Sequence, residues 1–230
     1  IGIACHSVAL LTRILESQRP PFTNMYETLL FFSWLLVICS VVIERRYSIK
    51  ILGAFTLPIV FLSLASMSLI SSEIMPLLPA LKSNWLLSHV LTCFLAYTAF
   101  AIAAATSSMY LICELLLRFG KARAVVENTT LDLLDAVTYR AITLGFPLLT
   151  IGIVTGSVWA DTCWGTYWSW DPKETWSLIT WLVYGICLHL RHTANWRGRH
   201  GALASIVGFL SVIFTYFGVN YLLSGLHAYS

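Results

Sequence analysis

The chain has 230 residues, of which 58% are hydrophobic and only 11% are charged, with a mean hydropathy of +0.77 and a net charge of +3. A soluble globular domain carries about 25% charged residues, so this composition excludes that class and predicts an integral membrane protein. We expect an all-α, polytopic helical bundle that forms a single membrane domain over residues 1–230. The chain opens with IGIACHSVAL, which is apolar and has no starting Met, and we interpret this as a truncated first span.

Seven apolar stretches are long enough, wholly or in part, to cross a bilayer, which takes about 20 helical residues. In chain order they are residues 1–15, 26–43, 51–70, 85–117, 141–158, 175–190 and 202–223. The fourth is too long for one straight crossing, so we expect its end to project beyond the membrane. Residues 127–140 are amphipathic and predict a helix that lies in the interface or leads into the fifth span.

Basic residues alternate between the predicted loops. Segments 44–50, 118–123 and 191–200, together with Arg140, hold ten of the fourteen Lys and Arg residues. By the positive-inside rule these segments face the cytoplasm or its equivalent, the n-side. The opposite side, the p-side, then receives segments 16–27, 71–84 and 159–174 and the C-terminus.

Motifs for several other chemistries do not occur in the sequence. There is no Walker motif, no G-x-G-x-x-G, no H-E-x-x-H and no basic run for binding nucleic acid. The six cysteines form neither C-x-x-C nor the C-x-x-C-H haem-attachment motif. Five of them lie in apolar stretches, where Cys is usually a small buried hydrophobe. We expect the sixth, Cys163, in a loop, and interpret it as an unreactive thiol rather than a redox group.

Two histidines are expected on the p-side, at the level of a tryptophan-rich segment. His89 lies near the start of the fourth span, and His227 follows the seventh. The tryptophans of the segment are Trp159, Trp164, Trp168 and Trp170. Two neutral imidazoles on either side of a flat ring system are the axial ligands of a six-coordinate haem, so one interpretation is a haem site. The alternative is a belt of interfacial His and Trp that anchors the protein in the membrane.

The other histidines have different positions. His189 lies fourteen residues into the sixth span, about 21 Å below its start, toward the n-side. An ionisable residue within the membrane is a functional candidate, and a neutral His that is hydrogen-bonded between helices is the alternative. We interpret His6, also within a span, as a core histidine rather than a second deep ligand. His192 and His200 lie in a basic loop and are predicted to be solvated.

The segment WSWDPKETW, residues 168–176, contains the start of a helix. Asp171 is a favoured N-cap, Pro172 suits the first helical position, and Glu174 at the third position completes a capping box. Both carboxylates therefore have a structural role in starting the sixth span. This role does not explain the neighbouring tryptophans, because a helix start requires no large rigid rings.

The pattern W-G-x-x-W-x-W-D-x-x-E resembles the WWD signature of haem-handling proteins in cytochrome c maturation. It is filled here by Trp164, Gly165, Trp168, Trp170, Asp171 and Glu174. Residues 140–191, PPFTNMYE (20–27) and YFGVNYLLSGLHAYS (216–230) are similar to the CcsA/ResC type of bacteria and chloroplasts. The resemblance covers nearly the whole chain.

This resemblance implies a set of haem-binding residues. His89 and His227 correspond to the pair of p-side histidines that bind the iron of haem b, and His189 to a transmembrane histidine that helps haem across the membrane. The WWD segment, residues 159–176, provides the haem-facing residues Trp159, Trp164, Trp168, Trp170, Asp171 and Glu174. The family's other transmembrane histidine normally comes from a separate CcsB/ResB-type membrane partner.

The function implied is that of a haem-handling subunit of a cytochrome c synthase, in a bacterial inner membrane or a thylakoid membrane. An apocytochrome c would bring its C-x-x-C-H motif to the bound haem, and this chain would supply positioning rather than acid–base chemistry. There are three alternatives to this function. One is a CcmC/CcmF-type protein of another assembly pathway, and another is a structural subunit with an aromatic belt. The third is a transporter or channel whose p-side aromatics bind a small substrate, which predicts broken helices at mid-membrane, and the sequence has no matching pair of interrupted spans.

Overall fold

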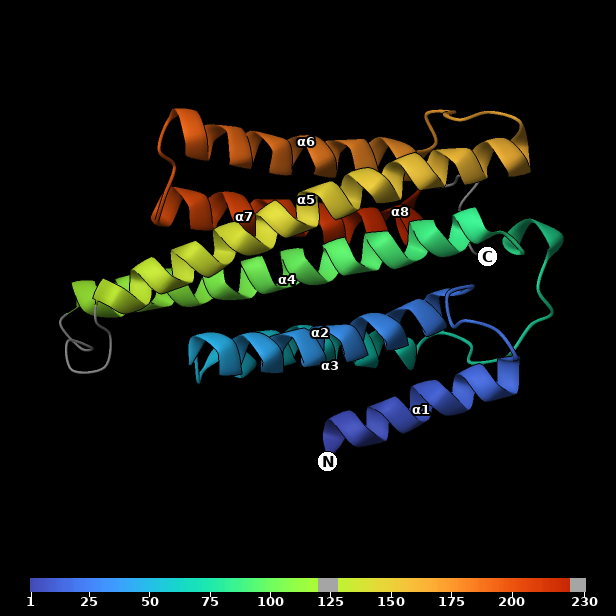
Figure 1. Cartoon of the computed structure of the whole chain (residues 1–230), viewed down its shortest axis with the longest axis horizontal. Helices are drawn as coiled ribbons and strands as arrows, with labels where there is room; N and C mark the ends of the chain where they lie inside the picture. The colour runs from blue at the N-terminus through green and yellow to red at the C-terminus, as the bar shows by residue number, and fades with distance from the viewer. Residues whose placement is uncertain (120–127, 224–230) are drawn as a thin grey trace.

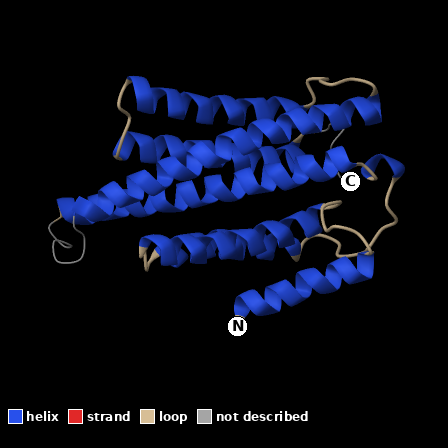
Figure 2. Cartoon of the chain, in the orientation of Figure 1, coloured by secondary structure: helices blue, strands red, loops and turns tan. Residues whose placement is uncertain are grey.

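The structure is a computed structural model that describes residues 1–119 and 128–223, and within these ranges it contains helices and loops but no strand (Figure 2). The helices are α1 (Gly2–Ser17), α2 (Met25–Tyr47), α3 (Leu52–Met67), α4 (Asn84–Arg118), α5 (Asn128–Trp164), α6 (Pro172–Thr193), α7 (Arg199–Ile213) and α8 (Val219–Leu222). A 3₁₀ turn, η1 (Pro79–Leu81), precedes α4, and a π-helical segment, η2 (Phe214–Gly218), joins α7 to α8. The predicted all-helical bundle is confirmed.

Helix α4 is at the centre of the bundle. It packs along α5 over most of its length and also contacts α2, α3 and α7. Helices α6 and α7 pack together on one side of α4 and α5, at the top of Figure 1, whereas α2 and α3 form a pair on the opposite side, below α4. Helix α1 lies at the edge of the molecule, next to α2 (Figure 1).

The connections between helices fall into two sets, one at each end of the bundle. The α1–α2, α3–α4 and α5–α6 connections lie at one end, and the α2–α3 and α6–α7 connections lie at the other (Figure 1). The sequence predicts, from the alternation of Lys and Arg, that the loops fall into two groups on opposite sides of the membrane. The loops at the two ends of the bundle match these groups. The membrane side that each end faces remains a prediction.

Within residues 1–119 and 128–223, four helical segments have the length and composition to cross a bilayer. They are Met25–Tyr47, Asn84–Arg118, Thr130–Trp164 and Arg199–Leu222. The other predicted spans are also helical, but α1 and α3 have only 16 residues each, and α6 begins and ends with charged and polar residues. Helix α4 has 35 residues, or about 52 Å, which exceeds the hydrocarbon thickness as expected.

The fifth helix differs from the prediction at its end. It runs to Trp164 rather than Val158, so the expectation that Cys163 lies in a loop is wrong. The helix stops because Gly165 adopts a φ of 75°, while its amide still donates to the Asp161 carbonyl at 2.9 Å. The connecting loop is therefore residues 165–171, and Trp159 belongs to α5. At the other end of α5, the amphipathic segment continues directly into the helix.

Small residues allow the helices to pack closely in the core. The rings of Phe100 on α4 and Tyr184 on α6 are stacked, with centroids 3.6 Å apart and an interplanar angle of 8°. An added Cβ at Gly145 would lie 2.6 Å from the Phe100 ring, and one at Gly208 would lie 2.6 Å from the Tyr184 ring. Helices α5 and α7 can approach this pair only because these two residues have no side chain.

Candidate functional site

A large pocket lies at the end of the bundle that carries the α5–α6 loop. It encloses about 1030 Å³ of empty space, part of which is open to solvent, between α2, α4, α5, α6, η2 and α8. Its aromatic lining comprises Phe22, Phe94, Tyr97, Trp159, Tyr167, Trp168 and Tyr216. A concave pocket with a mostly apolar lining and a few polar groups is typical of a binding site for a small molecule or cofactor.

His89 lies in the wall of this pocket with a defined ring orientation. Its Nδ1 lies 2.7 Å from the Gly152 carbonyl oxygen of α5. A carbonyl only accepts, so Nδ1 donates, and in the neutral ring the acceptor nitrogen is Nε2. Metal-ligating histidines usually donate their other ring N–H to a carbonyl or carboxylate in this way. The geometry around His89 therefore fits an axial ligand that binds iron through Nε2.

Two glycines of α5 make room for His89. An added Cβ at Gly156 would lie 2.5 Å from His89 Nδ1 and 2.7 Å from its Cε1. At Gly152 an added Cβ would lie 2.5 Å from the sulfur of Cys93, which is one turn beyond His89 on α4. The spacing Gly152-x-x-x-Gly156 is that of small-residue contacts between membrane helices. Here it allows α4 and the imidazole to lie directly against the α5 backbone.

The four tryptophans of the WWD segment have different positions. Trp159 is buried, lines the pocket, and donates its Nε1 proton to the Ala80 carbonyl of η1 at 2.9 Å. Trp164 packs edge-on against it, with centroids 5.0 Å apart. Trp168 also lines the pocket, whereas Trp170 is 68% exposed. The four indoles thus do not form one flat plate, and two of them face the pocket.

The carboxylates of the WWD segment form the predicted helix cap. Asp171 accepts the Lys173 amide at 3.0 Å, and Glu174 accepts the Asp171 amide at 3.2 Å, which completes the capping box. Glu174 also accepts the Ser169 amide at 2.8 Å and lines the pocket, so it holds the loop as well as starting α6. Trp170, just before the cap, has a φ of 60°, which is rare for a bulky residue.

Two other histidines that the sequence singles out, His189 and His6, lie apart from the pocket. His189 is near the C-terminal end of α6, where its side chain is exposed, about 24 Å along the helix from Lys173. His6 lies 3.0 Å from the Leu30 carbonyl of α2, through Nε2, in agreement with its interpretation as a core histidine. His227 lies outside the described residues.

Sequence reasoning did not identify Lys173 as a residue of the site. It lies in the first turn of α6, before the predicted apolar span, and its Nζ donates to Asn220 Oδ1 at 3.0 Å. Burial lowers the pKa of Lys173 to about 8, against the opposing effects of the Asp171 carboxylate and Cys93. The sequence did contain a signal for this residue, because Lys173 is the single Lys or Arg in the tryptophan-rich segment 159–176.

The π-helical segment η2 gives the pocket another polar wall. The Tyr216 hydroxyl lies 2.7 Å from Thr28 Oγ1 of α2 and donates to the Met25 carbonyl at 3.3 Å. Asn220 Nδ2 donates to the Tyr216 carbonyl at 2.7 Å. Such bulges in helices often occur at functional sites. Here the bulge brings Tyr216 and Asn220 to the pocket.

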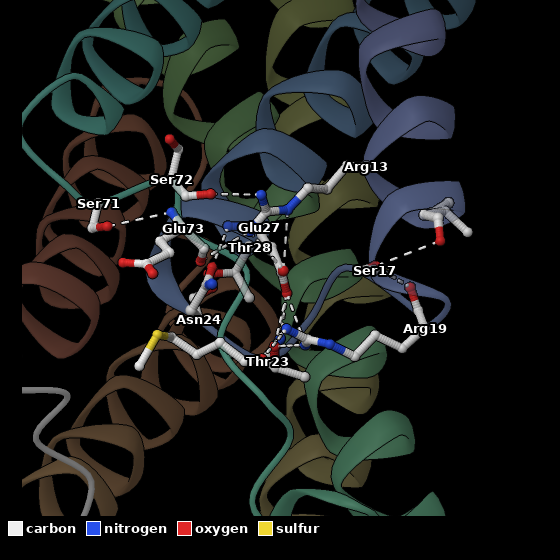
Figure 3. A network of polar contacts seen from close by, with 12 residues as sticks. Arg13, Ser17, Arg19, Thr23, Asn24, Glu27, Thr28, Ser71, Ser72 and Glu73 are labelled. Carbon is white, nitrogen blue, oxygen red and sulfur yellow. Dashed lines mark hydrogen bonds and ion pairs between the residues drawn. The ribbon is translucent and has the colours of Figure 1, made fainter.

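A buried ionic network lies beside the pocket, at the start of α2 (Figure 3). Glu27 is fully buried, and its Oε1 accepts from Arg13 at 3.1 and 3.2 Å. Its Oε2 accepts from the Thr23 hydroxyl at 2.8 Å and from Arg19 at 3.4 Å. The sequence contained a signal for this network, since an acidic residue opens an apolar helix with two arginines shortly before it.

The same network holds the α3–α4 connection. Arg13 Nη1 donates to the Ser72 carbonyl at 2.6 Å, as Figure 3 shows. The far part of this connection accepts the Trp159 indole proton at Ala80. The α3–α4 connection is thus held at both ends, by Arg13 and by a residue of the pocket wall.

Comparison with known proteins gives a family match over residues 22–227, to the family described as Cytochrome C assembly protein. The chain belongs to this family. The match includes every pocket residue named above, from Phe22 to Asn220, whereas Arg13 precedes it.

Individual members of the cytochrome c assembly family resemble the chain along nearly its whole length. It is 40% identical to a protein of Guillardia theta over 99% of this chain and 83% of that one, and 36% identical to one of Gloeobacter violaceus over 100% and 86%. A protein of Chlamydomonas reinhardtii is 42% identical over 96% of this chain and 64% of its own length. Each is named "Cytochrome c biogenesis protein CcsA", so the resemblance to the CcsA type is confirmed.

Proposed function

We propose that this integral membrane protein acts in cytochrome c biogenesis by binding haem in the pocket and presenting it to apocytochrome c. The observation that carries the proposal is the hydrogen bond from His89 Nδ1 to the Gly152 carbonyl at 2.7 Å. It makes Nε2 the acceptor nitrogen of a residue that lines an aromatic pocket, and neutral imidazole is a common axial ligand of haem iron.

The remaining parts of the site follow from the family. We propose His227 as the second axial ligand on the same side of the membrane. Trp159 and Trp168 would pack against the macrocycle, because both line the pocket. Trp164, Asp171 and Glu174 would support these residues, Trp164 by its contact with Trp159 and the carboxylates by starting α6. The substrate would be haem b.

We propose a separate role for His189, as a ligand that helps haem across the membrane. Its side chain is exposed on α6, away from the pocket. A ligand in this position requires a second protein to enclose the haem, and a CcsB/ResB-type subunit with its own transmembrane histidine would provide it. The pocket end of the bundle would face the p-side, in agreement with the positive-inside rule.

The chemistry of attachment requires little of this chain beyond positioning. Each cysteine thiol of the apocytochrome adds across a haem vinyl group, so that sulfur bonds to one vinyl carbon and the proton goes to the other. His89 would hold the iron, and the indoles would fix the plane of the ring. Holding the reactants in a productive geometry can contribute about 7–11 kcal/mol of the barrier.

Absorption spectra of the purified protein test the haem proposal. We expect His89→Ala and His227→Ala each to abolish the haem absorbance or to make it depend on added imidazole. His200→Ala is the matched control, because His200 is exposed in the first turn of α7, at the other end of the bundle. Unchanged spectra in both site variants would refute the ligand assignment.

A further inference from the structure

A second cavity of the bundle has no part in the haem site proposed above. It encloses about 690 Å³ of empty space, part of which is open, between α2, α3, α4, α7 and η2. Helices α3 and α7 both pack on α4, and the cavity forms a groove between them. Phe94, Tyr97 and Tyr216 line both the groove and the pocket, so the groove lies directly behind one wall of the pocket.

The groove leads from the outer surface of the bundle into its core. Two apolar residues at its edge are on the surface, Leu62 of α3 with 64% of its area exposed and Ile213 of α7 with 39%. In an integral membrane protein such side chains face the hydrocarbon of the bilayer. Leu29 of α2 and Phe94 of α4, which also line the groove, are buried. The groove is therefore open toward the bilayer and closed by the core.

The lining of the groove offers little to a polar ligand. Among the described residues that form it there is no histidine and no charged side chain. The hydroxyls of Ser63 and Ser66 donate to the carbonyls of Ile59 and Leu62, one turn earlier on α3, at 2.9 and 2.7 Å. Burial of a charge in such a lining has no compensation. A haem placed in the groove would find no imidazole for its iron and no cation for its propionates.

A hydrocarbon chain matches both the chemistry and the shape of the groove. The lining residues Ile59 and Ser66 are seven positions apart on α3, so the groove extends about 10 Å along this helix. Ser66 lies in the last turn of α3, at the end of the bundle that carries the pocket. An empty apolar space would deprive its lining atoms of van der Waals contacts. In a bilayer the molecules at hand to supply these contacts are lipids.

We propose that an acyl chain of a membrane phospholipid fills the groove between α3 and α7 and packs against Phe94 and Tyr97, behind the wall of the pocket. The phospholipid enters from the leaflet at the pocket end of the bundle, with its headgroup beyond Ser66. The inference goes beyond the proposed haem function, and none of its tests requires haem.

Lipid retained by the purified full chain tests the proposal. We expect native mass spectrometry of the wild type to show a bound phospholipid that survives exchange into lipid-free detergent. Ser63→Phe places a ring in the groove and should abolish this retention. Added phospholipid should raise the Tm of the delipidated wild type but not that of Ser63→Phe. A phospholipid with a diazirine near the end of one acyl chain should crosslink to Phe94, which is buried from the surrounding bilayer.

Two further variants make the test specific to the groove. Leu57→Phe is the matched control, because Leu57 is on the same helix but is exposed and lies outside the groove, so this variant should retain phospholipid. Ser66→Phe, at a half-buried lining position, repeats the test if Ser63→Phe does not fold. Equal retention by the wild type and both groove variants would overturn the proposal, as would a wild type that retains no lipid. A retained molecule with the mass of an isoprenoid quinone or of haem would overturn the choice of occupant.

Discussion

His89 on α4 and Gly152 on α5 are joined by a 2.7 Å hydrogen bond from the imidazole Nδ1 to the backbone carbonyl. The bond is possible because α5 has glycine at positions 152 and 156, where a methyl group would meet Cys93 and the imidazole. A pair of glycines in one membrane helix thus determines the orientation of a candidate iron ligand on another. The glycines are therefore as much a part of the proposed site as the histidine.

Gly156→Ala tests this relationship directly. The new Cβ would lie 2.5 Å from His89 Nδ1, so the ring must move and its bond to Gly152 must lengthen or break. We expect the haem absorbance of the purified protein to shift or fall, as we also expect for His89→Ala. Gly185→Ala is the control, since its Cβ would meet Phe146 at an ordinary 3.5 Å. Equal spectra for the two glycine variants would argue against this role of Gly156.

Lys173 makes the stability of the haem-free protein depend on pH. Its pKa falls from 10.5 to about 8 on folding, so between these values the unfolded chain binds more protons and stability rises with pH. Below pH 8 the burial cost is fully present and amounts to at most about 3 kcal/mol. Lys173→Met removes this cost and loses one hydrogen bond to Asn220.

The measurement for Lys173→Met is therefore a comparison of Tm values between pH 7 and pH 10.5. The Tm of the variant, relative to wild type, should be highest at pH 7 and should decline steadily through the window. A difference that is constant with pH would show that folding does not perturb the titration of Lys173.

Glu27→Gln should destabilise the end of the bundle that carries the pocket. The substitution leaves Arg13, which is only 8% exposed, without its carboxylate, and breaking a buried pair costs about 3–5 kcal/mol. We expect a lower Tm and faster hydrogen exchange in the α3–α4 connection that Arg13 holds. Glu16→Gln is the control, because Glu16 is exposed on α1. A similar Tm for the two variants would mean that the network adds little stability.

Several features of the fold were predictable because they depend on local sequence. The capping box is an example, since Asp171 and Glu174 are three residues apart and one turn of helix brings them together. The grouping of the loops into two ends follows from the alternation of basic residues along the chain. The position of His89 in the pocket follows from its place near the start of α4.

Other features were not predictable because they depend on contacts between distant segments or on one backbone angle. Lys173 and Asn220 are 47 residues apart, and their contact depends on the π-helical segment η2, which leaves no simple periodic signal. The end of α5 depends on the φ of Gly165. Because the helix continues until this residue, Trp159 lies in α5 and not in the loop that follows it.

Asp171→Asn separates the structural role of the WWD carboxylate from any further role. Asn is as good an N-cap as Asp, so the bond to the Lys173 amide and the start of α6 should persist with little change in Tm. The loss of the carboxylate charge should lower the pKa of Lys173 further, because Asp171 is the larger of the two effects that raise it. We therefore expect normal protein levels and a Lys173 ammonium that loses its proton at a lower pH than in the wild type. Loss of cytochrome c maturation at normal protein level and unchanged Tm would instead indicate a direct role of the carboxylate.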